Sequence, residues 1–418
     1  MSDIRNELVY TTIILTDDSL TNDEKTEAIK ILNKNYDRHK ILYNSGTKRI
    51  CENCKQECLA TTYCEFCVRD YLEANFSNVE WIPYENFQNI KYLTKGGCSE
   101  IYTAIWIDGH YFEWNPKQKQ LKRFGTQEIV LKGLGNIENS SKDWFDEAKS
   151  HLTISNKWAS IVQCYGITQD PSDENYMLVM LEMAIDLRKY LQKNHKQLTW
   201  KKRIQITSDI INALYRIHLE NAIHRDLHSG NILYSKLNQR FCISDLGFCG
   251  PVNKPLKSTY GNLPYIAPEV IIGKQTTKAS DIYSIAMLMW EISSGQRPFI
   301  GYEHNYDLAM NIVNGIRPKN VLGTPLEYKS LMKQCWDSDP LKRPDIYTIL
   351  KKIDEINLSY QNTNEFEAND DIEIIITSDF ETTETNYANS LLSTSKIYQF
   401  ENLFEPKNAT EEEQEGIN

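Results

Sequence analysis

The apolar positions of the chain change their spacing part-way along it, and this change predicts strands first and helices later. Two short apolar runs, 129–132 and 176–180, favour strands because aliphatic and β-branched residues follow one another without helical spacing. Over 199–214, apolar residues instead recur at intervals typical of a helix. Residues 280–299 read as a buried helix that ends at Gly295.

Two further segments flank these elements. Residues 19–43 carry an apolar stripe behind the capping candidates Ser19, Thr21 and Asn22, with acidic residues early, so we expect a helix there. It is either a plain surface helix or one that docks on a partner or another domain. Residues 105–130 contain turn-forming glycines and a proline, which predicts an extended hairpin loop between two strands.

The charge of the chain is concentrated at one end. The formal net charge of the 418 residues is −11, and residues 361–418 alone hold 14 Asp and Glu against 2 Lys and Arg. This acidic and polar composition predicts a disordered tail, because it buries too little apolar surface to offset the entropy of ordering. The apolar patch 370–376 inside it is either a strand that adds to a partner's sheet or a segment that the rest of the chain buries.

The sequence shows no secretory signal, since the apolar run Val9–Leu15 is short and follows no basic region. The longest apolar stretch, Ile282–Ile292, falls far short of the roughly 20 residues that span a bilayer. Five of the ten cysteines fall between Cys51 and Cys67, and this clustering favours a reducing compartment over a disulfide framework. We therefore expect a soluble cytoplasmic protein without a membrane partner.

The cysteine cluster has the spacing of a zinc site. Cys51 and Cys54 form one CxxC pair, and Cys64 and Cys67 form a second pair after nine intervening residues. Four thiolates satisfy the tetrahedral preference of Zn²⁺ and leave no open position, so the predicted site is structural. Cys58 is the spare thiol on this interpretation, and redox chemistry is the alternative. No basic patch surrounds the cluster, so nucleic acid is not an expected partner.

The most informative stretch lies further on. Asp226 and Asn231 stand in HRDLHSGN, Asp245 stands in SDLG, and Ala267-Pro268-Glu269 follows. In this order the motifs resemble the catalytic loop, the metal-binding loop and the end of the activation segment of eukaryotic-type protein kinases. The resemblance runs from about Phe87 to Glu355, and later motifs are similar to the tyrosine-kinase-like group of Ser/Thr kinases.

The resemblance implies an α+β fold with two lobes, a small, mainly β N-lobe and a larger, mainly α C-lobe. The implied domains are an N-terminal helix and Cys-rich module (1–80), a protein kinase domain (87–355) and the acidic tail (361–418). The implied reaction is transfer of the γ-phosphate of ATP to Ser or Thr hydroxyls of protein substrates, in preference to Tyr, in intracellular signalling. The Cys-rich module and the tail are the expected contacts for other partner proteins.

The implied catalytic residues carry distinct roles. Asp226 would take or orient the proton of the acceptor hydroxyl, while Asn231 and Asp245 would hold Mg²⁺, which prefers oxygen ligands. Lys132, in a strand that resembles the V-A-I-K motif, would reach the ATP phosphates. Glu147 would pair with this lysine, with Asp146 and Asp143 as alternatives.

The ATP site would be completed by the glycine-rich loop, the strand that follows and the hinge. The loop departs from the family pattern because Thr94 and Ser99 replace its first and last glycines. Small residues are needed there for backbone amides to approach the phosphates. The full set of ATP-binding candidates is Leu93, Thr94, Gly96, Gly97, Ser99, Ile101, Val130, Lys132, Glu147, Glu182 and Ala184.

Other departures bear on activity. His228 stands where many Ser/Thr kinases have a lysine, and an ordinary imidazole is only partly charged near neutral pH, so we expect reduced or pH-sensitive catalysis. Ser258, Thr259 and Tyr260 are candidate phosphosites in the activation segment, or plain loop residues. The competing function is a pseudokinase that binds nucleotide and partners without phosphoryl transfer.

Overall fold

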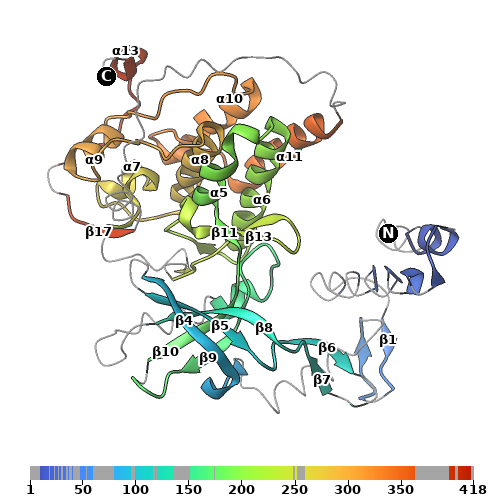
Figure 1. Cartoon of the computed structure of the whole chain (residues 1–418). Coiled ribbons are helices and arrows are strands. Elements are labelled where there is room, and N and C mark those ends of the chain that lie inside the picture. The colour runs from blue at the N-terminus through green and yellow to red at the C-terminus, as the bar shows by residue number, and fades with distance from the viewer. Residues whose placement is uncertain are drawn as a thin grey trace. The chain divides into compact units, whose positions relative to one another are not determined.

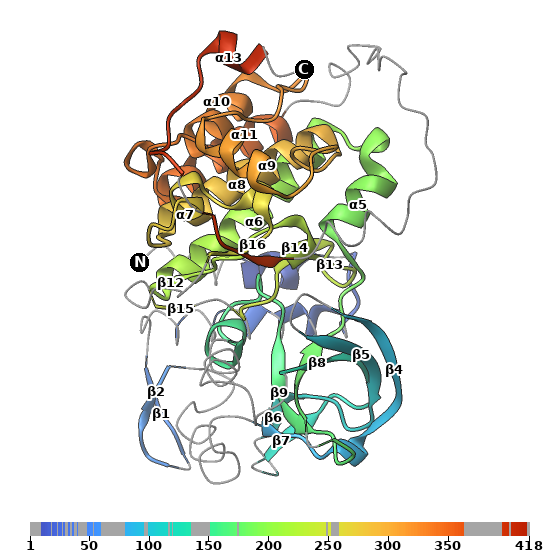
Figure 2. The ribbon, with the colours of Figure 1, turned by 90° about the vertical axis from the view of Figure 1, so that its left-hand side faces the viewer.

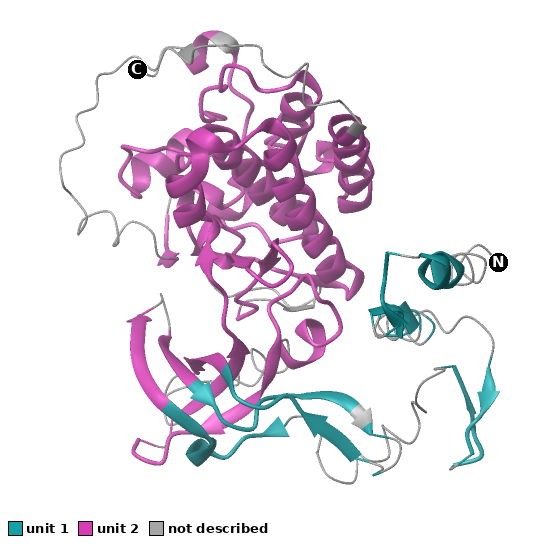
Figure 3. Cartoon of the chain, turned by 45° about the vertical axis from the view of Figure 1, so that its right-hand side comes forward, with its two compact units in different colours: residues 1–88, 105–127 teal, residues 89–104, 128–418 magenta. Residues whose placement is uncertain are grey.

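The structure is a computed structural model that divides the chain into two compact units, residues 1–88 with 105–127 and residues 89–104 with 128–418 (Figure 3). The residues that it describes are 10–17, 19–22, 24–26, 28–29, 32–33, 36, 40, 48–52, 54–59, 80–95, 99–115, 118, 120–134, 151–173, 175–247, 250–251, 259–362, 395–400 and 403–415.

The smaller unit begins with helical residues. Residues 10–16 are helical, and the described residues of 22–40 are largely helical as well. Thr21 starts the second stretch: its backbone N and hydroxyl donate to Glu24 Oε2 at 2.8 and 2.7 Å, and Glu24 N donates back to Thr21 Oγ1 at 3.3 Å. This reciprocal pair is a capping box, so Thr21 is the cap among the three candidates Ser19, Thr21 and Asn22.

The smaller unit also contains two hairpins. Strands β1 (Arg49–Ile50) and β2 (Glu57–Cys58) pair antiparallel, as do β6 (Tyr111–Asn115) and β7 (Gln120–Arg123). The second hairpin is the connection predicted between Ile105 and Val130. Arg123 secures it, because its guanidinium lies 3.6 Å from the Tyr111 ring centre and 2.6 Å from Glu80 Oε1. The unit also holds β3 (Glu80–Trp81) and the 3₁₀ turn η1 (Tyr84–Asn86).

The N-terminal lobe of the larger unit contains a sheet with the strand order β9-β10-β8-β5-β4, in which β10 pairs antiparallel with both β8 and β9. In its centre, Lys132 pairs with Leu178 and Leu131 with Val179, which confirms the two strands predicted from the apolar runs. The strands are β4 (Phe87–Lys95), β5 (Glu100–Trp106), β8 (Gln127–Gly133), β9 (Cys164–Gln169) and β10 (Tyr176–Leu181), with a π-helical turn, η2 (His151–Ser155), before β9.

The C-terminal lobe is mainly helical, so the expected two-lobed α+β fold is confirmed (Figure 1). Thr199 caps the longest helix by accepting a hydrogen bond from Lys202 N. The helix predicted over 280–299 begins at Lys278, two residues before the predicted start. It ends at Gly295 as expected, and the φ of 72° at this glycine suits a left-handed cap. The helices are α5 (Leu187–Asn194), α6 (Trp200–Leu219), α7 (Pro268–Ile271), α8 (Lys278–Ser294), α9 (Tyr306–Val313), α10 (Leu326–Cys335) and α11 (Ile346–Asn362), with the 3₁₀ turns η3 (His195–Gln197) and η6 (Pro340–Lys342).

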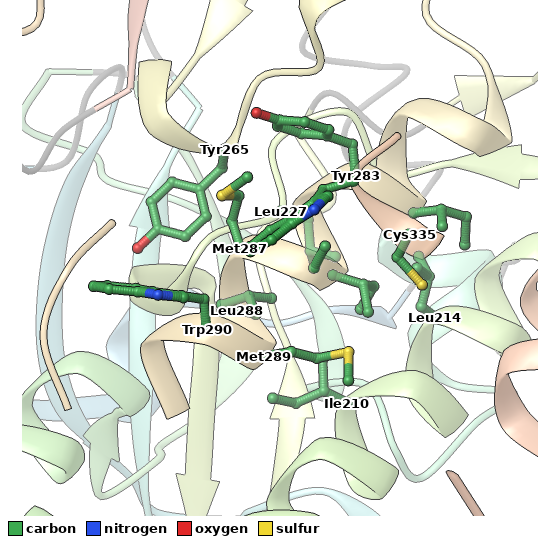
Figure 4. Close-up of a cluster of buried hydrophobic side chains, with 14 of the residues drawn as sticks. Ile210, Leu214, Leu227, Tyr265, Tyr283, Met287, Leu288, Met289, Trp290 and Cys335 are labelled. Atoms are coloured by element: carbon green, nitrogen blue, oxygen red, sulfur yellow. The ribbon is translucent and has the colours of Figure 1, made fainter. Parts of the chain in front are cut away.

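The core of this lobe lies between α6, α8 and α10, which contribute Ile210, Met289 and Cys335 to one cluster of buried side chains (Figure 4). Leu227 is part of the same core and is only 2% exposed. Burying one such side chain stabilises the fold by about 1.5–3 kcal/mol. Because Leu227 follows Asp226 directly, the core fixes the loop that carries the main candidate residue.

The C-terminal tail is structured over residues 395–400 and 403–415. Strand β17 (Lys396–Tyr398) pairs antiparallel with β16 (Thr259–Gly261), and the last described residues form the short helix α13 (Glu411–Glu415) (Figure 2). The prediction of a disordered tail is wrong for these residues, because aromatic side chains and backbone pairing hold them on the C-lobe. The apolar patch 370–376 lies outside the described residues.

Candidate active site

The loop that carries Asp226 is held between two pairs of short strands. It follows β12 (Ala222–Ile223), passes through the 3₁₀ turn η4 (Ser229–Asn231) and enters β13 (Ile232–Ser235). Strand β14 (Arg240–Ile243) pairs antiparallel with β13 and leads to Asp245. The hairpin therefore brings the two motifs of the sequence, HRDLHSGN and SDLG, to one place.

Asp281 anchors the backbone of this loop. Its carboxylate accepts hydrogen bonds from His224 N at 2.9 Å and from Arg225 N at 3.0 Å, and it lies 2.9 Å from His218 Nε2. Arg225 has a φ of 72°, a strained conformation for a residue with a side chain. These contacts tie the backbone of the loop to Asp281 on α8.

Two buried histidines brace the backbone around Asp245. The ring of His224 is 3.0 Å from Ser244 O and accepts from Asp226 N at 3.3 Å, as a packed structural residue would. His151 Nε2 accepts a hydrogen bond from Leu246 N at 3.1 Å. Burial, with the charge of Lys132, lowers the pKa of His151 to about 3, so this ring is a neutral acceptor. Sequence reasoning missed His151 because it lies 95 positions from its partner.

Lys132 and Asp245 form a close ion pair. Lys132 Nζ lies 2.6 Å from Asp245 Oδ1. Burial alone would raise the pKa of Asp245, but the charge and hydrogen bond of Lys132 outweigh it and lower the pKa. Asp245 has a φ of 54°, so its backbone is strained as well. Glu147 and its alternatives Asp143 and Asp146 lie outside the described residues, and their expected pairing with Lys132 stays a prediction.

Asp226 is a buried carboxylate with an unusually high proton affinity. It is only 6% exposed, and Asn231 Nδ2 donates to its backbone O at 2.9 Å. Burial raises the pKa of Asp226 to about 7, and the charge of Asp245 adds to the rise. A carboxylate with a pKa near neutrality is well matched to accept a proton.

The charge of the His228 side chain differs from the expectation. His228 is buried, and its Nδ1 accepts a hydrogen bond from Gly230 N at 3.0 Å, so the neutral ring carries its proton on Nε2. Burial, followed by the charge of Arg188, lowers the pKa of His228 to about 3. The expected partial charge near neutral pH is therefore wrong, because desolvation removes it.

A tail residue completes the site. Ser395 Oγ lies 2.7 Å from Asp226 Oδ1 and 3.2 Å from His228 Nε2, and all three side chains are buried. Sequence reasoning missed Ser395 because 169 positions separate it from Asp226. A weak signal was present, since residues 391–400 contain no acidic residue and hold three apolar side chains after Lys396.

The nucleotide-site candidates are spread over the N-terminal lobe and the hinge. Ala184 N donates to Tyr234 O at 3.0 Å, just before β11 (Ile185–Asp186), and burial with the neighbouring Glu128 raises the pKa of Glu182. Gly96 and Gly97 lie outside the described residues. The other described candidates are Leu93 and Thr94 on β4, Ser99 before β5, Ile101 on β5, and Val130 and Lys132 on β8.

The activation segment is fixed at its far end. Arg343 donates to both Glu269 oxygens, at 2.8 and 2.7 Å, and both side chains are buried. Tyr265, in η5 (Leu263–Tyr265), donates to Glu291 Oε2 at 2.5 Å. Of the candidate phosphosites, Thr259 and Tyr260 lie on β16 and Ser258 lies outside the described residues.

The cysteine module is only partly described. Cys51 and Cys58 are buried and pack with Cys54, so Cys58 belongs with the first CxxC pair and not apart from it. Cys64 and Cys67 lie outside the described residues. Among the residues that the structure describes, no group of three or more metal-ligating side chains is poised to hold a metal ion.

Comparison with known protein families shows the family of the chain. A family model described as protein tyrosine and serine/threonine kinase matches residues 87–353. The chain belongs to this family. The match covers both lobes and every described candidate of the kinase active site, from Leu93 to Asp245. In the described part of this kinase, no helix is long and apolar enough to cross a membrane.

Curated relatives of this kinase are themselves named protein kinases. The probable serine/threonine-protein kinase roco7 of Dictyostelium discoideum is 26% identical over 302 residues, 70% of this chain and 11% of that protein. The dual specificity protein kinase zakA of the same organism is 31% identical over 43% of this chain and 25% of its own length. The human dual serine/threonine and tyrosine protein kinase is 34% identical over 40% of this chain and 18% of its own. The chain thus matches at most a quarter of each of these relatives.

Proposed function

We propose that this chain is an ATP-dependent protein kinase that phosphorylates Ser and Thr hydroxyls. The observation that carries the proposal is the contact between Asp226 and a serine hydroxyl, with Ser395 Oγ 2.7 Å from the carboxylate. A general base must lie within about 2.6–3.2 Å of the proton that it accepts, and this pair does. The ion pair of Lys132 and Asp245 supplies the charged groups on the phosphate side.

The residues fit ATP and Mg²⁺ by the chemistry of their donors. Asp245 and Asn231 offer carboxylate and amide oxygens, which Mg²⁺ prefers, and the bond from Ser244 N to Asn231 O at 2.8 Å couples their backbones. Mg²⁺ would neutralise the charge that develops on the transferred phosphate. Lys132 would orient the phosphates, Asp226 would accept the proton of the acceptor hydroxyl, and Leu227 in the core would keep that base in place.

The preference for Ser and Thr is supported by the relatives named serine/threonine and dual specificity kinases. Tyr265 supports the same assignment, because tyrosine kinases usually have Trp at this position. The proposed setting is intracellular signalling in the cytoplasm, with protein substrates.

The decisive test compares the full chain with Asp226→Asn in transfer of radiolabelled phosphate from ATP to casein and to itself. We expect labelling by the wild type to fall to background in the variant, while ATP binding is retained. Equal labelling by both proteins would remove the assignment of Asp226 and, with it, the proposed reaction.

The rival function, a pseudokinase, is favoured by one observation. His228 is neutral and buried where a lysine would place a positive charge near the transferred phosphate. We expect this to slow the reaction without abolishing it. The substitution His228→Lys should raise transfer to casein at pH 8, whereas a pseudokinase would show none in either form.

A structural zinc ion in the N-terminal module remains part of the proposal. Its support is the paired CxxC spacing and the packing of Cys51, Cys54 and Cys58 around one turn, closed by the hydrogen bond from Lys55 N to Cys51 O at 2.9 Å. We expect about one zinc per chain by elemental analysis. Cys54→Ser should lower that content, and Cys335→Ala, in the helical lobe, should leave it unchanged. The module and the tail are the proposed contacts for partner proteins.

A further inference from the structure

The C-terminal tail lies across the active site in the manner of an acceptor peptide. Strand β17 pairs antiparallel with β16 of the activation segment: Lys396 pairs with Gly261, Ile397 with Tyr260 and Tyr398 with Thr259. A Cβ added to Gly261 would lie 3.4 Å from Asp226 Oδ1, so β16 runs directly beside the candidate base. The residue before the paired strand, Ser395, is thereby delivered to Asp226.

The hydrogen bonds at Ser395 orient its hydroxyl for transfer. Because His228 Nδ1 accepts from Gly230 N, the proton of this neutral ring is on Nε2, which donates to Ser395 Oγ. The hydroxyl proton of Ser395 is then donated to Asp226 Oδ1. One lone pair of Oγ remains for attack on phosphorus, with the base already in place.

The register of the tail is fixed by side chains on both sides of β17. Tyr398 is buried and stacks on Phe400 at 5.4 Å between ring centres, and Phe400 meets Tyr306 of α9 edge-on at 6.2 Å. If the pairing of β17 with β16 slipped by one residue, every side chain of β17 would move to the opposite face of the strand. The backbone pairing and the aromatic contacts together therefore hold Ser395 in the position at Asp226.

The following residues anchor the tail on the C-lobe. Lys407 N donates to Val313 O at 3.1 Å, and Ser338 Oγ donates to Lys407 O at 2.6 Å. Asn408 both accepts from Ser338 N and donates to Asp337, at 2.9 and 3.0 Å. Residues 363–394 join α11 to Ser395, and about 30 residues reach at most roughly 100 Å when extended, so the same chain can supply the acceptor.

We propose that Ser395 is a phosphorylation site of the chain's own kinase active site, occupied in cis by the docked tail. The inference rests on the proposed kinase function. In the step, Ser395 Oγ forms a bond to the γ-phosphorus of ATP while the bond from that phosphorus to the β,γ-bridging oxygen breaks. ADP leaves with the electron pair, and the hydroxyl proton moves to the Asp226 carboxylate. The phosphate group formed beside Asp226 carries negative charge, so repulsion then releases the tail.

The test incubates the full-length wild type with Mg²⁺ and ATP and maps phosphate by mass spectrometry. Phosphate is expected on Ser395 at an initial rate per chain that does not change over a tenfold range of protein concentration. Ser395→Ala should abolish this phosphate, and the matched variant Ser393→Ala should leave it. A tagged Asp226→Asn chain mixed with the wild type should stay unlabelled at Ser395, whereas label on it would overturn transfer in cis.

Transfer to casein, followed in the same samples, separates the inference from the proposed function. Phosphorylated casein with Ser395 unmodified would overturn the inference alone, because the tail would then only occupy the site. Loss of both reactions would overturn the proposed function as well. Phe400→Ala leaves the catalytic residues intact and should reduce Ser395 phosphorylation by roughly tenfold or more through lost docking, with no loss of transfer to casein. An unchanged rate at Ser395 in this variant would count against docking as the cause.

Discussion

Replacement of Asp281 by Asn tests whether the catalytic loop depends on one buried carboxylate. Asp281 is 1% exposed, and its two oxygens together accept from His224 N and Arg225 N and contact His218 Nε2. Asparagine has the same shape but only one acceptor oxygen. Whichever way the amide is turned, its NH₂ group faces the backbone N–H of either His224 or Arg225.

The expected losses of stability and of rate follow from this one backbone N–H that loses its acceptor. One buried N–H left without an acceptor costs about 1–3 kcal/mol, so the free energy of unfolding should fall by that amount. The loss also frees Arg225 from a strained φ of 72°, a conformation that holds about 1–3 kcal/mol when the surroundings enforce it. Relaxation there moves the neighbouring Asp226, and a displacement of about 1 Å at a reacting group is enough for a loss on the order of 100-fold in rate.

Urea denaturation and steady-state transfer to casein measure the two effects. Asp307→Asn is the matched control, because this exposed residue in the first turn of α9 should change stability by less than about 0.5 kcal/mol and leave activity intact. If Asp281→Asn is as stable and as active as that control, the carboxylate of Asp281 does not hold the catalytic loop. A stable but inactive variant would show instead that the carboxylate acts on the reaction and not on the loop.

Three further predictions concern other buried ionisable side chains. Lys132→Met should reduce phosphoryl transfer to background with an unchanged circular dichroism spectrum, and activity in the variant would show that Asp245 needs no cation. Glu269→Gln should lower the free energy of unfolding by about 3–5 kcal/mol because it leaves Arg343 buried without its carboxylate, whereas adding Arg343→Met should restore part of it in a double-mutant cycle. The folded-state pKa of His151 is lowered to about 3, so the unfolded chain binds the extra proton below pH 6.5 and stability is lost as the pH falls towards 3. Between pH 7 and 5 this loss is about 2 kcal/mol, so urea denaturation of His151→Gln should show that much less pH dependence than the wild type.

The sequence allowed prediction of the parts of the site that sit on short motifs. Asp226 and Asn231 come just before the β13–β14 hairpin and Asp245 just after it, so their spacing along the chain already fixes their arrangement in space. The central strands and the end of α8 at Gly295 were also predictable, because apolar runs and a left-handed glycine act locally.

The parts that could not be predicted depend on distant residues. Burial of His228 by surrounding elements reversed its expected charge, and no feature of HRDLHSGN reports that burial. The acidic composition of the tail misled for a related reason. It is an average over 361–418, and it hides a short segment in which Ser395 and Tyr398 are buried against the C-lobe. Composition predicts the behaviour of a segment on average, whereas docking needs only a few well-placed residues such as Tyr398 and Phe400.

The location of Ser395 has a consequence for every other substrate of this kinase. A tethered segment meets its site at an effective concentration of about millimolar, whereas a separate protein at about micromolar concentration competes at a disadvantage of roughly a thousandfold when the intrinsic affinities are equal. The unphosphorylated tail therefore suppresses reaction with outside substrates for as long as its hydroxyl is bound to Asp226. Once a phosphate occupies Ser395, its negative charge beside Asp226 removes that advantage. Transfer of one phosphate to Ser395, beside the Asp226 carboxylate, therefore both modifies the tail and opens the site to other substrates.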